Sequence, residues 1–447
     1  MTEPLTKNGS TSFVYRTFVN NFCLPSIRKF LGVFLTNSRE RLLLEVPGID
    51  YNEVFGQDNK DNNNLDKPVV FRIDKPVHFC WLMLLNPKMG LGETYMADDW
   101  SVSPNPIELL RLLIRAKRQS KEKSRKPRNS QFSFAKFFTE LGIDLIRKTA
   151  AAVNYLQHCL LENSLTQSTK NIQAHYDLGN DMFQLFLDKS MTYSCALFED
   201  ADTPISDVDF RILEEAQYRK IDKLLESLNL GPNDHVLEIG CGWGAAGVRA
   251  AKLYGCKWTG CTISNEQLDW AREKVVENNL EPLVNYEFQD YRLITGKYSR
   301  ILSIEMIEAV GEKYLPQYFQ VLSDRLEEGG IAAIQAIICP DAYYDSYRTS
   351  SDFIKKYIFP GGHLPSLGAI KNSLPSDLEQ TSEFHMAAHY AKTLEHWYFA
   401  WMNAEDTIRT FNYPCDFHRR WQFYFCLCSA LFSGDNIDVV QLTYTKK

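Results

Sequence analysis

The chain has 447 residues and a formal net charge of -7 at pH 7. This length predicts two to three domains, and the acidic balance argues against nucleic acid as the main partner. The eleven cysteines include no C-x-x-C pair, so neither a zinc site nor a disulfide framework is expected, and reduced cysteines in a cytoplasmic protein are favoured. No apolar run long enough for a membrane span and no secretory signal pattern is present.

The first 115 residues are predicted to form a small α+β domain. Phe18–Leu35 mixes aromatic and basic residues, which fits an amphipathic helix that touches lipid or, equally, a helix packed on a core. Pro104 and Pro106 introduce an apolar helix over Ile107–Ile114. Short strands are expected over three apolar runs, Arg39–Tyr51, Val69–Ile73 and Val77–Leu85.

Residues 116–165 are predicted to connect this domain to the rest of the chain. The run Arg115–Arg128 consists mainly of Lys and Arg. A solvated linker is the default interpretation of such a run, and a patch for anionic phospholipid head groups is the alternative. Ser133–Leu165 has apolar residues at helical spacing and is predicted to be a long connecting helix.

A glycine-rich turn lies in the second half of the chain. The apolar run Val236–Ile239 has the pattern of a buried strand, and Ala245–Leu253 has helix-forming composition. Gly240, Gly242 and Gly244 between them give the spacing G-x-G-x-G rather than the G-x-G-x-x-G of dinucleotide sites. Glu238 is an anion that suits the ammonium of a methionine-derived ligand. The turn therefore predicts an S-adenosylmethionine site, with an ordinary tight turn as the alternative.

The elements around and after this turn alternate as a parallel sheet requires. A helix is expected over Ile205–Leu228, ahead of the turn. Further strands are predicted over Trp258–Ile263, Val284–Phe288, Ser299–Ile304 and Gly330–Ile338, with helices over Asn265–Asn278 and Tyr314–Leu326. An aromatic helix over Tyr390–Phe411 and a last strand, Val439–Tyr444, at the sheet edge complete the pattern. Residues 166–447 are thus predicted to form one doubly wound α/β domain.

Several separated motifs resemble a single family. They are His175–Asp181 (HYDLGND), Met191–Cys195 (MTYSC), Leu237–Gly244 (LEIGCGWG), Thr262–Ser264 with Gln267, Glu308–Gly311 (EAVG), and Tyr357–Pro360 with Leu364–Ser366. In this order they resemble the cyclopropane-fatty-acyl-phospholipid synthase family, which includes the mycolic acid cyclopropane synthases, over about residues 85–447. Gly92–Met96 with Trp100 looks like that family's lipid-associated N-terminal domain.

The resemblance implies a fold, a cofactor and a reaction. It implies a Rossmann-like class I S-adenosylmethionine methyltransferase domain that transfers a methyl group to a cis double bond of a lipid acyl chain. Loss of a proton from the new methyl closes a cyclopropane ring, and family members use a bound bicarbonate as the base. Unsaturated phospholipid acyl chains, a peripheral membrane surface and a cytoplasmic location are therefore expected, and a homodimer is considered.

The resemblance also assigns catalytic positions. Cys195, Glu308, the main-chain amide of Ile337 and the hydroxyl of Tyr398 are expected around the bicarbonate. Glu305 competes with Glu308, although the motif favours Glu308. Gln335 stands where bacterial members commonly carry a histidine, and an amide can donate a hydrogen bond but cannot carry a proton charge. Gln335 therefore leaves ring closure less certain than methyl transfer.

The cofactor positions follow from the same resemblance. Tyr193 and Ser194 are expected at the methionine end, the three glycines beneath it, Thr262–Gln267 at the ribose, and Asp290 with Tyr291 at the adenine. The complete predicted set is Tyr193, Ser194, Glu238, Gly240, Gly242, Trp243, Gly244, Thr262, Ser264, Gln267, Asp290 and Tyr291.

Four functions remain open from the sequence. The first is cyclopropane formation on unsaturated phospholipids, and the second is methyl transfer that gives a methyl-branched or methylene-bearing chain without a ring. The third is N-methylation of a small amine, since some plant amine methyltransferases resemble this family. The fourth is a non-catalytic lipid-binding protein that retains the cofactor site. Cys195 and the lipid-type N-terminal segment favour the first two.

Overall fold

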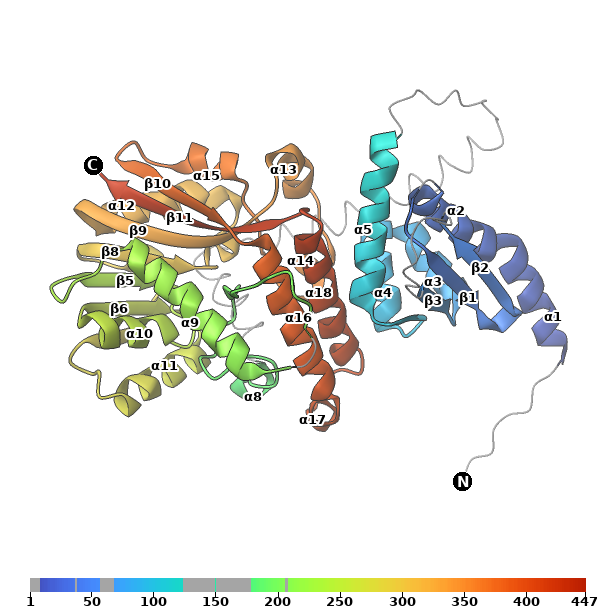
Figure 1. Ribbon diagram of the computed structural model, residues 1–447, viewed down its shortest axis with the longest axis horizontal. Coiled ribbons are helices and arrows are strands. Elements are labelled where there is room, and N and C mark those ends of the chain that lie inside the picture. Colours follow the sequence, from blue (N-terminus) through green and yellow to red (C-terminus); the bar gives the residue numbers. More distant parts are fainter. Residues whose placement is uncertain (1–8, 37, 57–67, 124–148, 150–177, 206–207) are drawn as a thin grey trace. The chain divides into compact units, whose positions relative to one another are not determined.

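The computed structural model describes residues 9–36, 38–56, 68–123, 149, 178–205 and 208–447 (Figure 1). The chain divides into two compact units, residues 1–153 with 414–430 and residues 154–413 with 431–447. The predicted motif segment His175–Asp177 and nearly all of the predicted helix Ser133–Leu165 lie outside the described residues. None of the helices in the described ranges combines the length and apolar character needed to cross a bilayer.

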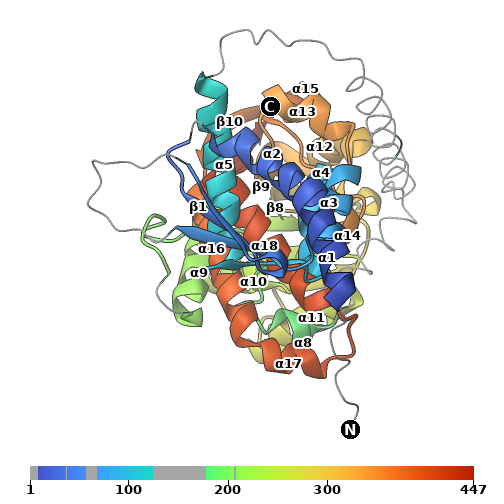
Figure 2. The same ribbon diagram turned by 90° about the vertical axis from the view of Figure 1, so that its right-hand side faces the viewer.

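The N-terminal unit contains a four-stranded sheet in the order β2-β1-β3-β4. Its strands are β1 (Leu42–Val46), β2 (Tyr51–Phe55), β3 (Val69–Ile73) and β4 (Trp100–Ser103). β1 pairs with β2 antiparallel and with β3 in parallel. The helices of this unit, seen in Figure 2, are α1 (Gly9–Phe18), the π-helical η1 (Val19–Cys23), α2 (Leu24–Leu35), the short 3₁₀ turn η2 (Pro47–Ile49), α3 (Pro76–Leu85), α4 (Pro87–Met96) and α5 (Pro106–Lys123).

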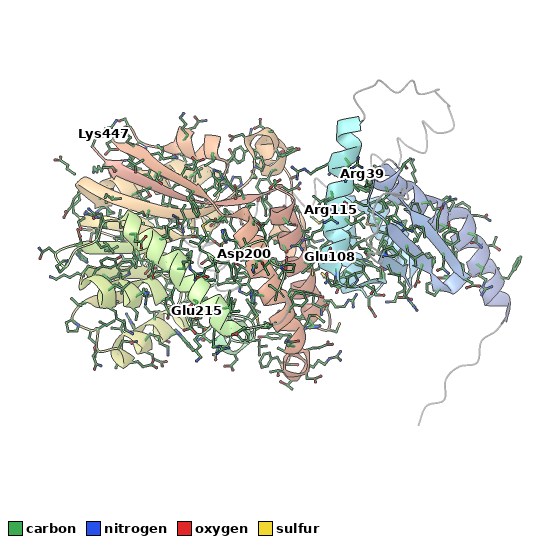
Figure 3. All side chains as sticks on the ribbon, viewed as in Figure 1. Arg39, Glu108, Arg115, Asp200, Glu215 and Lys447 are labelled. Atoms are coloured by element: carbon green, nitrogen blue, oxygen red, sulfur yellow. The ribbon has the colours of Figure 1, made fainter. Side chains whose placement is uncertain are left out.

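Three predictions for this unit were wrong in detail. Arg39–Tyr51 is not a single strand, because β1 ends at Val46 and the turn η2 separates it from β2. Val77–Leu85 is not a strand but forms α3, because an unbroken apolar run carries no period that separates strand from helix and Pro76 suits a first helical turn. α5 continues to Lys123 instead of ending at Ile114. The Arg115 side chain on α5, labelled in Figure 3, donates two hydrogen bonds of 2.9 Å to the Glu40 carboxylate. The basic run is therefore helical as far as Lys123, and the rest of it lies outside the described residues.

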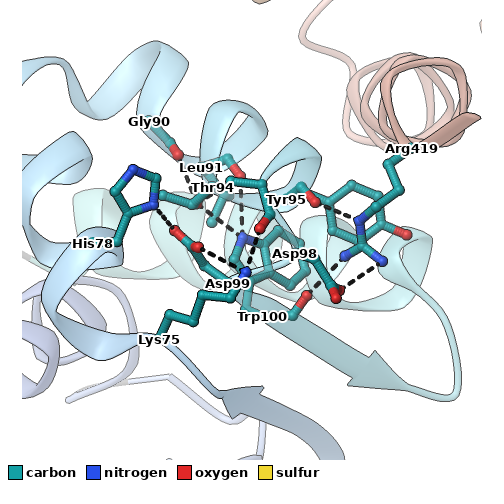
Figure 4. Close-up of polar contacts among 11 residues, drawn as sticks. Lys75, His78, Gly90, Leu91, Thr94, Tyr95, Asp98, Asp99, Trp100 and Arg419 are labelled. Atoms are coloured by element: carbon teal, nitrogen blue, oxygen red, sulfur yellow. Dashed lines mark hydrogen bonds and ion pairs between the residues drawn. The ribbon is translucent and has the colours of Figure 1, made fainter. Parts of the chain in front are cut away.

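Residues 414–430 belong to the N-terminal unit, although they were predicted to be part of the C-terminal domain. They include most of the unpredicted helix α18 (Phe417–Ser433). Arg419 on α18 donates hydrogen bonds to the carbonyl oxygens of Tyr95 and Trp100 and pairs with Asp98 at 3.1 Å (Figure 4). Gln422 Oε1 accepts a hydrogen bond of 3.0 Å from the Tyr95 hydroxyl. These contacts join segments that are far apart in the sequence, so no local sequence pattern could predict them.

The C-terminal unit is built on a seven-stranded sheet in the order β10-β11-β9-β8-β5-β6-β7, which can be followed from β10 to β6 in Figure 1. The strands are β5 (His235–Ile239), β6 (Lys257–Thr262), β7 (Val284–Phe288), β8 (Tyr298–Ile304), β9 (Leu326–Ile338), β10 (Leu378–His385) and β11 (Asp438–Lys446). β5 to β9 are parallel, whereas β11 runs antiparallel to both β9 and β10. The final strand is therefore not at the edge as predicted, because the mainly exposed β10 covers it.

Helices cover both faces of this sheet. α9 (Phe210–Ser227), α10 (Ala245–Tyr254) and α11 (Asn265–Glu277) bury one face, and α12 (Leu315–Arg325) with α15 (Leu367–Ser373) buries the other. Successive residues of β5 enter opposite cores, Val236 on one side and Leu237 on the other. Both faces are apolar for this reason, which explains why the strands read as continuous apolar runs. Ser264 caps α11 as predicted, since its hydroxyl accepts a hydrogen bond from the Gln267 amide.

The remaining elements lie in the loops of the C-terminal unit. They are α8 (Asn180–Phe183), η3 (Tyr291–Leu293), η4 (Ile307–Ala309), η5 (Glu312–Tyr314), α13 (Asp341–Arg348), α14 (Phe353–Tyr357), α16 (Ala387–Asn403) and α17 (Glu405–Thr410). From β5 the chain adds β6 and β7 on one side and then returns to add β8 on the other. This reversal is the topological switch point where doubly wound sheets bind ligands beyond the carboxyl ends of their strands. The predicted Rossmann-like α/β fold is confirmed.

Candidate active site

A pocket opens at this switch point. Its wall is formed by the residues that follow β5, β6, β7 and β8, together with the loop that holds Tyr193. Ten of the twelve predicted cofactor residues line it: Tyr193, Ser194, Glu238, Gly240, Gly242, Trp243, Thr262, Gln267, Asp290 and Tyr291. Gly244 and Ser264 are absent from the lining, because each begins a helix behind the pocket wall. Most of the predicted cofactor residues are thus brought together by the fold.

The glycine turn leaves bare backbone beneath the pocket. Gly240 (φ 79°) passes so close to Met306 that an added Cβ would come within 2.6 Å of its Cγ. Gly242 (φ 52°) differs, because a Cβ added there would meet no atom within 4 Å. Packing against protein therefore does not account for glycine at position 242. The space above it suits a ligand that approaches the main chain closely.

Glu238 lies at the end of β5 and is almost fully buried. Its Oε2 accepts a hydrogen bond of 2.8 Å from Trp258 Nε1. Burial raises the pKa of Glu238 to about 8, an effect that the Trp258 hydrogen bond and the nearby Lys220 only partly offset. A ligand ammonium would favour the ionised carboxylate. The donor set and the open glycine turn therefore fit the amino acid end of S-adenosylmethionine.

Lys220 was missed by sequence reasoning. It is fully buried on α9, and its Nζ donates a hydrogen bond of 2.6 Å to Ser194 Oγ. Gln217, one turn earlier, donates from Nε2 to the carbonyl oxygen of Ser194 at 2.8 Å. Burial lowers the pKa of Lys220 to about 8, although Glu305 and Glu238 oppose this shift. The available signal was a lysine placed on the apolar stripe of a helix between Leu213 and Leu224.

The far end of the pocket carries the predicted ribose and adenine residues. The Thr262 hydroxyl donates to Gln267 Oε1 at 2.8 Å, which orients the Gln267 amide. The Asp290 carboxylate is held by Arg292, whose Nε and Nη2 donate at 2.8 and 2.6 Å. Arg292 also lines the pocket and was not predicted. Asp290 therefore lines the pocket while its carboxylate forms a bidentate ion pair with Arg292.

Glu305 follows β8 directly and lines the same pocket. Its Oε1 accepts hydrogen bonds from the Cys195 main-chain amide at 2.9 Å and from Gln335 Nε2 at 2.7 Å. Its Oε2 accepts one from the Tyr390 hydroxyl at 2.6 Å. The structure thus brings the predicted Cys195 and Gln335 together, but around a side chain that the sequence treated only as a competitor of Glu308.

Glu308 lies one 3₁₀ turn beyond Glu305, in η4. Its Oε1 accepts a hydrogen bond from the Ile337 amide, whereas the sequence placed both residues around a bicarbonate. Its Oε2 is buried and has no hydrogen-bond partner among the described residues. Burial, reinforced by the neighbouring Glu305, raises the pKa of Glu308 to about 8. The neutral acid is therefore the favoured form of Glu308 at neutral pH.

The tyrosine that reaches this network is Tyr390, not Tyr398. Both lie on α16, but only Tyr390 has its hydroxyl on Glu305. Tyr398 is buried beside the ring of Phe399, with ring centroids 5.2 Å apart, and it does not line the pocket. The structure favours Tyr390 for the role that the sequence assigned to Tyr398. When an aromatic-rich helix is matched to a family motif by sequence, the alignment can easily be wrong by two turns, because aromatic residues recur along the helix.

The expected bicarbonate does not fit this arrangement. The Cys195 amide, Gln335 Nε2 and the Tyr390 hydroxyl all donate to Glu305, and the Ile337 amide donates to Glu308. Three residues predicted around an added anion, Cys195, Gln335 and Ile337, therefore donate to carboxylates of the chain itself, and so does Tyr390, which was not predicted. An added anion would also meet the charge of Glu305 in a buried site, which electrostatics disfavours.

Comparison with known proteins agrees with the site. A sequence model described as mycolic acid cyclopropane synthetase matches residues 163–442. The chain is 35% identical, over 80% of its length and 79% of the relative, to the tuberculostearic acid methyltransferase UfaA1 of Mycobacterium tuberculosis. It is 35% identical over 61% of its length, and 67% of the relative, to the cyclopropane-fatty-acyl-phospholipid synthase of Escherichia coli strain K12.

A solved structure shares the fold of the C-terminal unit. The mycolic acid cyclopropane synthase CmaA1, complexed with SAH and CTAB, is 30% identical with a TM-score of 0.57. The match covers 62% of this chain and 98% of that one.

Proposed function

The chain belongs to the mycolic acid cyclopropane synthetase family of S-adenosylmethionine-dependent methyltransferases, and on this premise we propose that it methylates a cis carbon–carbon double bond in an unsaturated phospholipid acyl chain. The observation that carries the proposal is the buried carboxylate network at one end of the cofactor pocket. Transfer of a methyl cation to an alkene leaves a positive carbon and then a surplus proton. An amine acceptor needs no such buried base, because nitrogen bears the charge and releases its proton to water.

The chain's own residues can organise this chemistry. When bound, S-adenosylmethionine supplies a methyl group attached to a positively charged sulfur. Glu238 and the bare backbone at Gly242 hold the amino acid end. The Glu305 carboxylate, which lines the pocket, stabilises positive charge at the reacting carbons. Orientation of the two reactants in a site that excludes water supplies the rest of the rate enhancement.

An aromatic cluster packs behind Tyr193, the one member of the cluster that lines the pocket. Tyr193 packs against Phe183, Phe186 and Trp397, with ring centroids 5.1 to 5.9 Å apart. Phe359 of the loop after α14 lies 6.4 Å from the Tyr193 ring. These ring contacts hold the Tyr193 side chain in place at the pocket wall.

Ring closure is the proposed outcome, and methyl branching is the second candidate. Both outcomes lose one proton and add one CH₂ to the lipid. Branching is favoured by the similarity to a tuberculostearic acid methyltransferase, and by Gln335, which cannot act as an acid or base. Glu305 keeps ring closure chemically accessible, because a base is present beside Gln335.

The deciding experiment uses purified protein, labelled S-adenosylmethionine and vesicles of unsaturated phospholipid. We expect labelled lipid that is heavier by one CH₂, as mass spectrometry would show. Catalytic hydrogenation then separates the two products, because a methylene group takes up hydrogen under mild conditions whereas a cyclopropane ring survives them. Label on a soluble amine with none on any lipid would contradict both forms of the proposal.

The N-terminal unit offers a surface for the membrane that holds this substrate. On α1 and η1 the side chains of Phe13, Val14, Phe18 and Phe22 are 74%, 70%, 45% and 63% exposed. The rings of Phe18 and Phe22 stack with centroids 5.1 Å apart, and Arg16 is exposed on the same helix. Exposed aromatics beside a basic residue are typical of helices that lie in a membrane interface. We therefore infer that α1 and η1 (the α1–η1 surface) bind the bilayer peripherally.

A further inference from the structure

We propose that the Glu305 carboxylate serves in this chain as the base that bicarbonate provides in the family, so that methyl transfer proceeds without bicarbonate. The proposal rests on the carbon methylation proposed above. Its basis is the position of Glu305, which lines the cofactor pocket and accepts hydrogen bonds from Cys195 and Gln335, both expected around the bound anion, and from Tyr390.

The hydrogen bonds to Glu305 leave one acceptor position open. Oε1 accepts two of them, from the Cys195 amide and Gln335 Nε2, and Oε2 accepts one from the Tyr390 hydroxyl. A carboxylate offers about four lone-pair positions, two on each oxygen. Oε2 therefore retains a lone pair that can take a proton while the three hydrogen bonds hold the group in place.

Gln335 is fixed as a donor towards Glu305. Its Oε1 accepts a hydrogen bond of 3.0 Å from Gln441 Nε2 on the neighbouring strand β11, where the two residues are direct partners. The Gln335 amide nitrogen must then face Glu305, and the whole side chain is buried. Gln335 and Gln441 are thus positioning residues, which gives a reason for glutamine where the family commonly carries histidine.

The backbone at Glu305 is strained. Its φ of 49° places a bulky non-glycine residue in the left-handed region. Such strain costs roughly 1–3 kcal/mol and persists where the surrounding structure holds it, commonly at functional sites. Here the strained residue is the one that directs its carboxylate at the Cys195 amide and the Tyr390 hydroxyl.

The carboxyl groups of Glu305 and Glu308 are close enough that only one of them is readily ionised. Two nearby carboxylates cannot both ionise cheaply in a buried site. Glu305 has three hydrogen-bond donors and the buried Lys220 as a cationic neighbour, whereas Glu308 has one donor and an unpartnered Oε2. Burial raises the pKa of both carboxyl groups, but the donors and Lys220 oppose this rise more strongly at Glu305. Glu305 is therefore the member of the pair that ionises first, and Glu308 the one that keeps its proton.

The step balances without any further reactant. The alkene π pair forms the new bond to the methyl carbon while the methyl–sulfur pair leaves with sulfur, and the second alkene carbon becomes cationic. For ring closure a C–H bond of the new methyl then breaks, its electron pair forms the last ring bond, and its proton moves to Glu305 Oε2. In the branching outcome a hydride first shifts from the methylated carbon to the cationic carbon. A C–H bond of the new methyl then breaks, its electron pair forms a double bond to the methylated carbon, and its proton moves to the same oxygen.

The test compares the wild type with three variants of the full chain in buffer stripped of carbon dioxide, with and without added bicarbonate. Glu305→Gly vacates the donors and suits the positive φ, whereas Glu305→Gln fills the same space without a charge. Glu328→Gln, at an exposed position of β9, is the control. Lipid methylation is measured together with bicarbonate binding, followed by the NMR line width of isotopically labelled bicarbonate.

We expect wild-type turnover to be the same with and without bicarbonate, and the wild type not to broaden the bicarbonate signal. Both Glu305 variants should lose about 100-fold or more in turnover, as loss of a general base implies. Bicarbonate should bind to Glu305→Gly and restore part of its turnover, and it should not rescue Glu305→Gln.

Wild-type turnover that falls on stripping and returns with bicarbonate would overturn the inference, as would bicarbonate binding to the wild type. Retention of full turnover in Glu305→Gln would do the same. All three leave the proposed lipid methylation standing. Absence of any lipid product would instead defeat the proposed function, and the wild-type binding measurement would still decide the inference. The measurement of bicarbonate binding to the wild type also decides the inference if neither Glu305 variant folds.

Discussion

At the scale of single residues, Glu305 and Glu308 differ in what surrounds each carboxyl group. Glu305 is held by a main-chain amide, an amide side chain and a hydroxyl, whereas Glu308 receives one main-chain hydrogen bond. Hydrogen bonds to a carboxylate favour its charged form, and burial without them favours the neutral acid. Two glutamates three residues apart are thereby suited to different roles.

The raised pKa of Glu308 predicts a pH-dependent stability. Because the folded protein holds the proton up to about pH 8 and the unfolded chain only to about 4.5, the contribution is complete below pH 4.5 and is lost as the pH rises to about 8. Glu308→Gln cannot titrate. Its unfolding free energy relative to the wild type should rise between pH 5 and 8, by about 1 kcal/mol or more. Urea unfolding at several pH values checks this, and a constant difference would contradict it.

The hydroxyl of Tyr390 carries a second prediction. Tyr390→Phe removes one donor to the Glu305 carboxylate without removing the ring. Hydrogen bonds to charged groups contribute about 1.5–3 kcal/mol, so turnover should fall by about 10- to 100-fold while the affinity for S-adenosylmethionine stays close to wild type. Tyr398→Phe is the matched comparison on the same helix. A larger loss of turnover in Tyr398→Phe would restore the assignment made from sequence.

At the scale of elements, the site depends on where strands end. Glu238, Thr262, Asp290 and Glu305 each lie at or just after the carboxyl end of a different parallel strand. Parallel strands present these ends at one edge of the sheet, so residues far apart in sequence converge there. The turn after β5 adds the open backbone at Gly242, which no neighbouring side chain covers.

Gly242→Ala should weaken cofactor binding specifically. The added methyl enters the open space above the turn, so the dissociation constant for S-adenosylmethionine should rise about tenfold or more, on top of a folding cost of about 1–2 kcal/mol for an L-residue at positive φ. Gly329→Ala is the control, because Gly329 also has positive φ (72°) and open space around its Cβ position but lies in β9 away from the pocket. Calorimetric titration measures both, and equal losses of affinity would contradict the prediction.

At the scale of the whole molecule, each of the two units carries a feature of its own. The C-terminal unit encloses the pocket within its own residues. The N-terminal unit has its own core, whose Trp100 is fully buried, yet leaves large apolar side chains on the α1–η1 surface exposed. Folding does not account for exposed aromatics on this scale, whereas the proposed contact with lipid would account for them.

Removal of the exposed rings should weaken vesicle binding. The double variant Phe18→Ser with Phe22→Ser loses apolar area that would enter the bilayer. We expect its partition onto phospholipid vesicles to fall by about tenfold or more, with affinity for S-adenosylmethionine unchanged. Leu253→Ser with Val276→Ser removes exposed apolar side chains from α10 and α11 and is the control. Flotation with vesicles measures both, and an equal effect of the two double variants would refute a role for the α1–η1 surface.

The sequence by itself determined the fold of the C-terminal unit and its cofactor turn. Apolar runs of strand length, the glycine spacing and the N-cap Ser264 are local signals, and each stands where it was predicted. The same locality explains the errors. Val77–Leu85 is apolar throughout, so its hydrophobicity has no period that would separate a helix from a strand. β10 has too few buried residues to show the hydrophobic pattern of a strand.

Only the tertiary structure decided how the acid network is arranged. Cys195, Glu305, Gln335 and Tyr390 come from a loop, two strand regions and a helix. The spacing of these four residues in the sequence does not indicate that their polar atoms form hydrogen bonds with one another. Residue types showed that carboxylates and an amide were present, but the hydrogen bonds that select Glu305, Tyr390 and the buried Lys220 exist only after the sheet and its helices have packed.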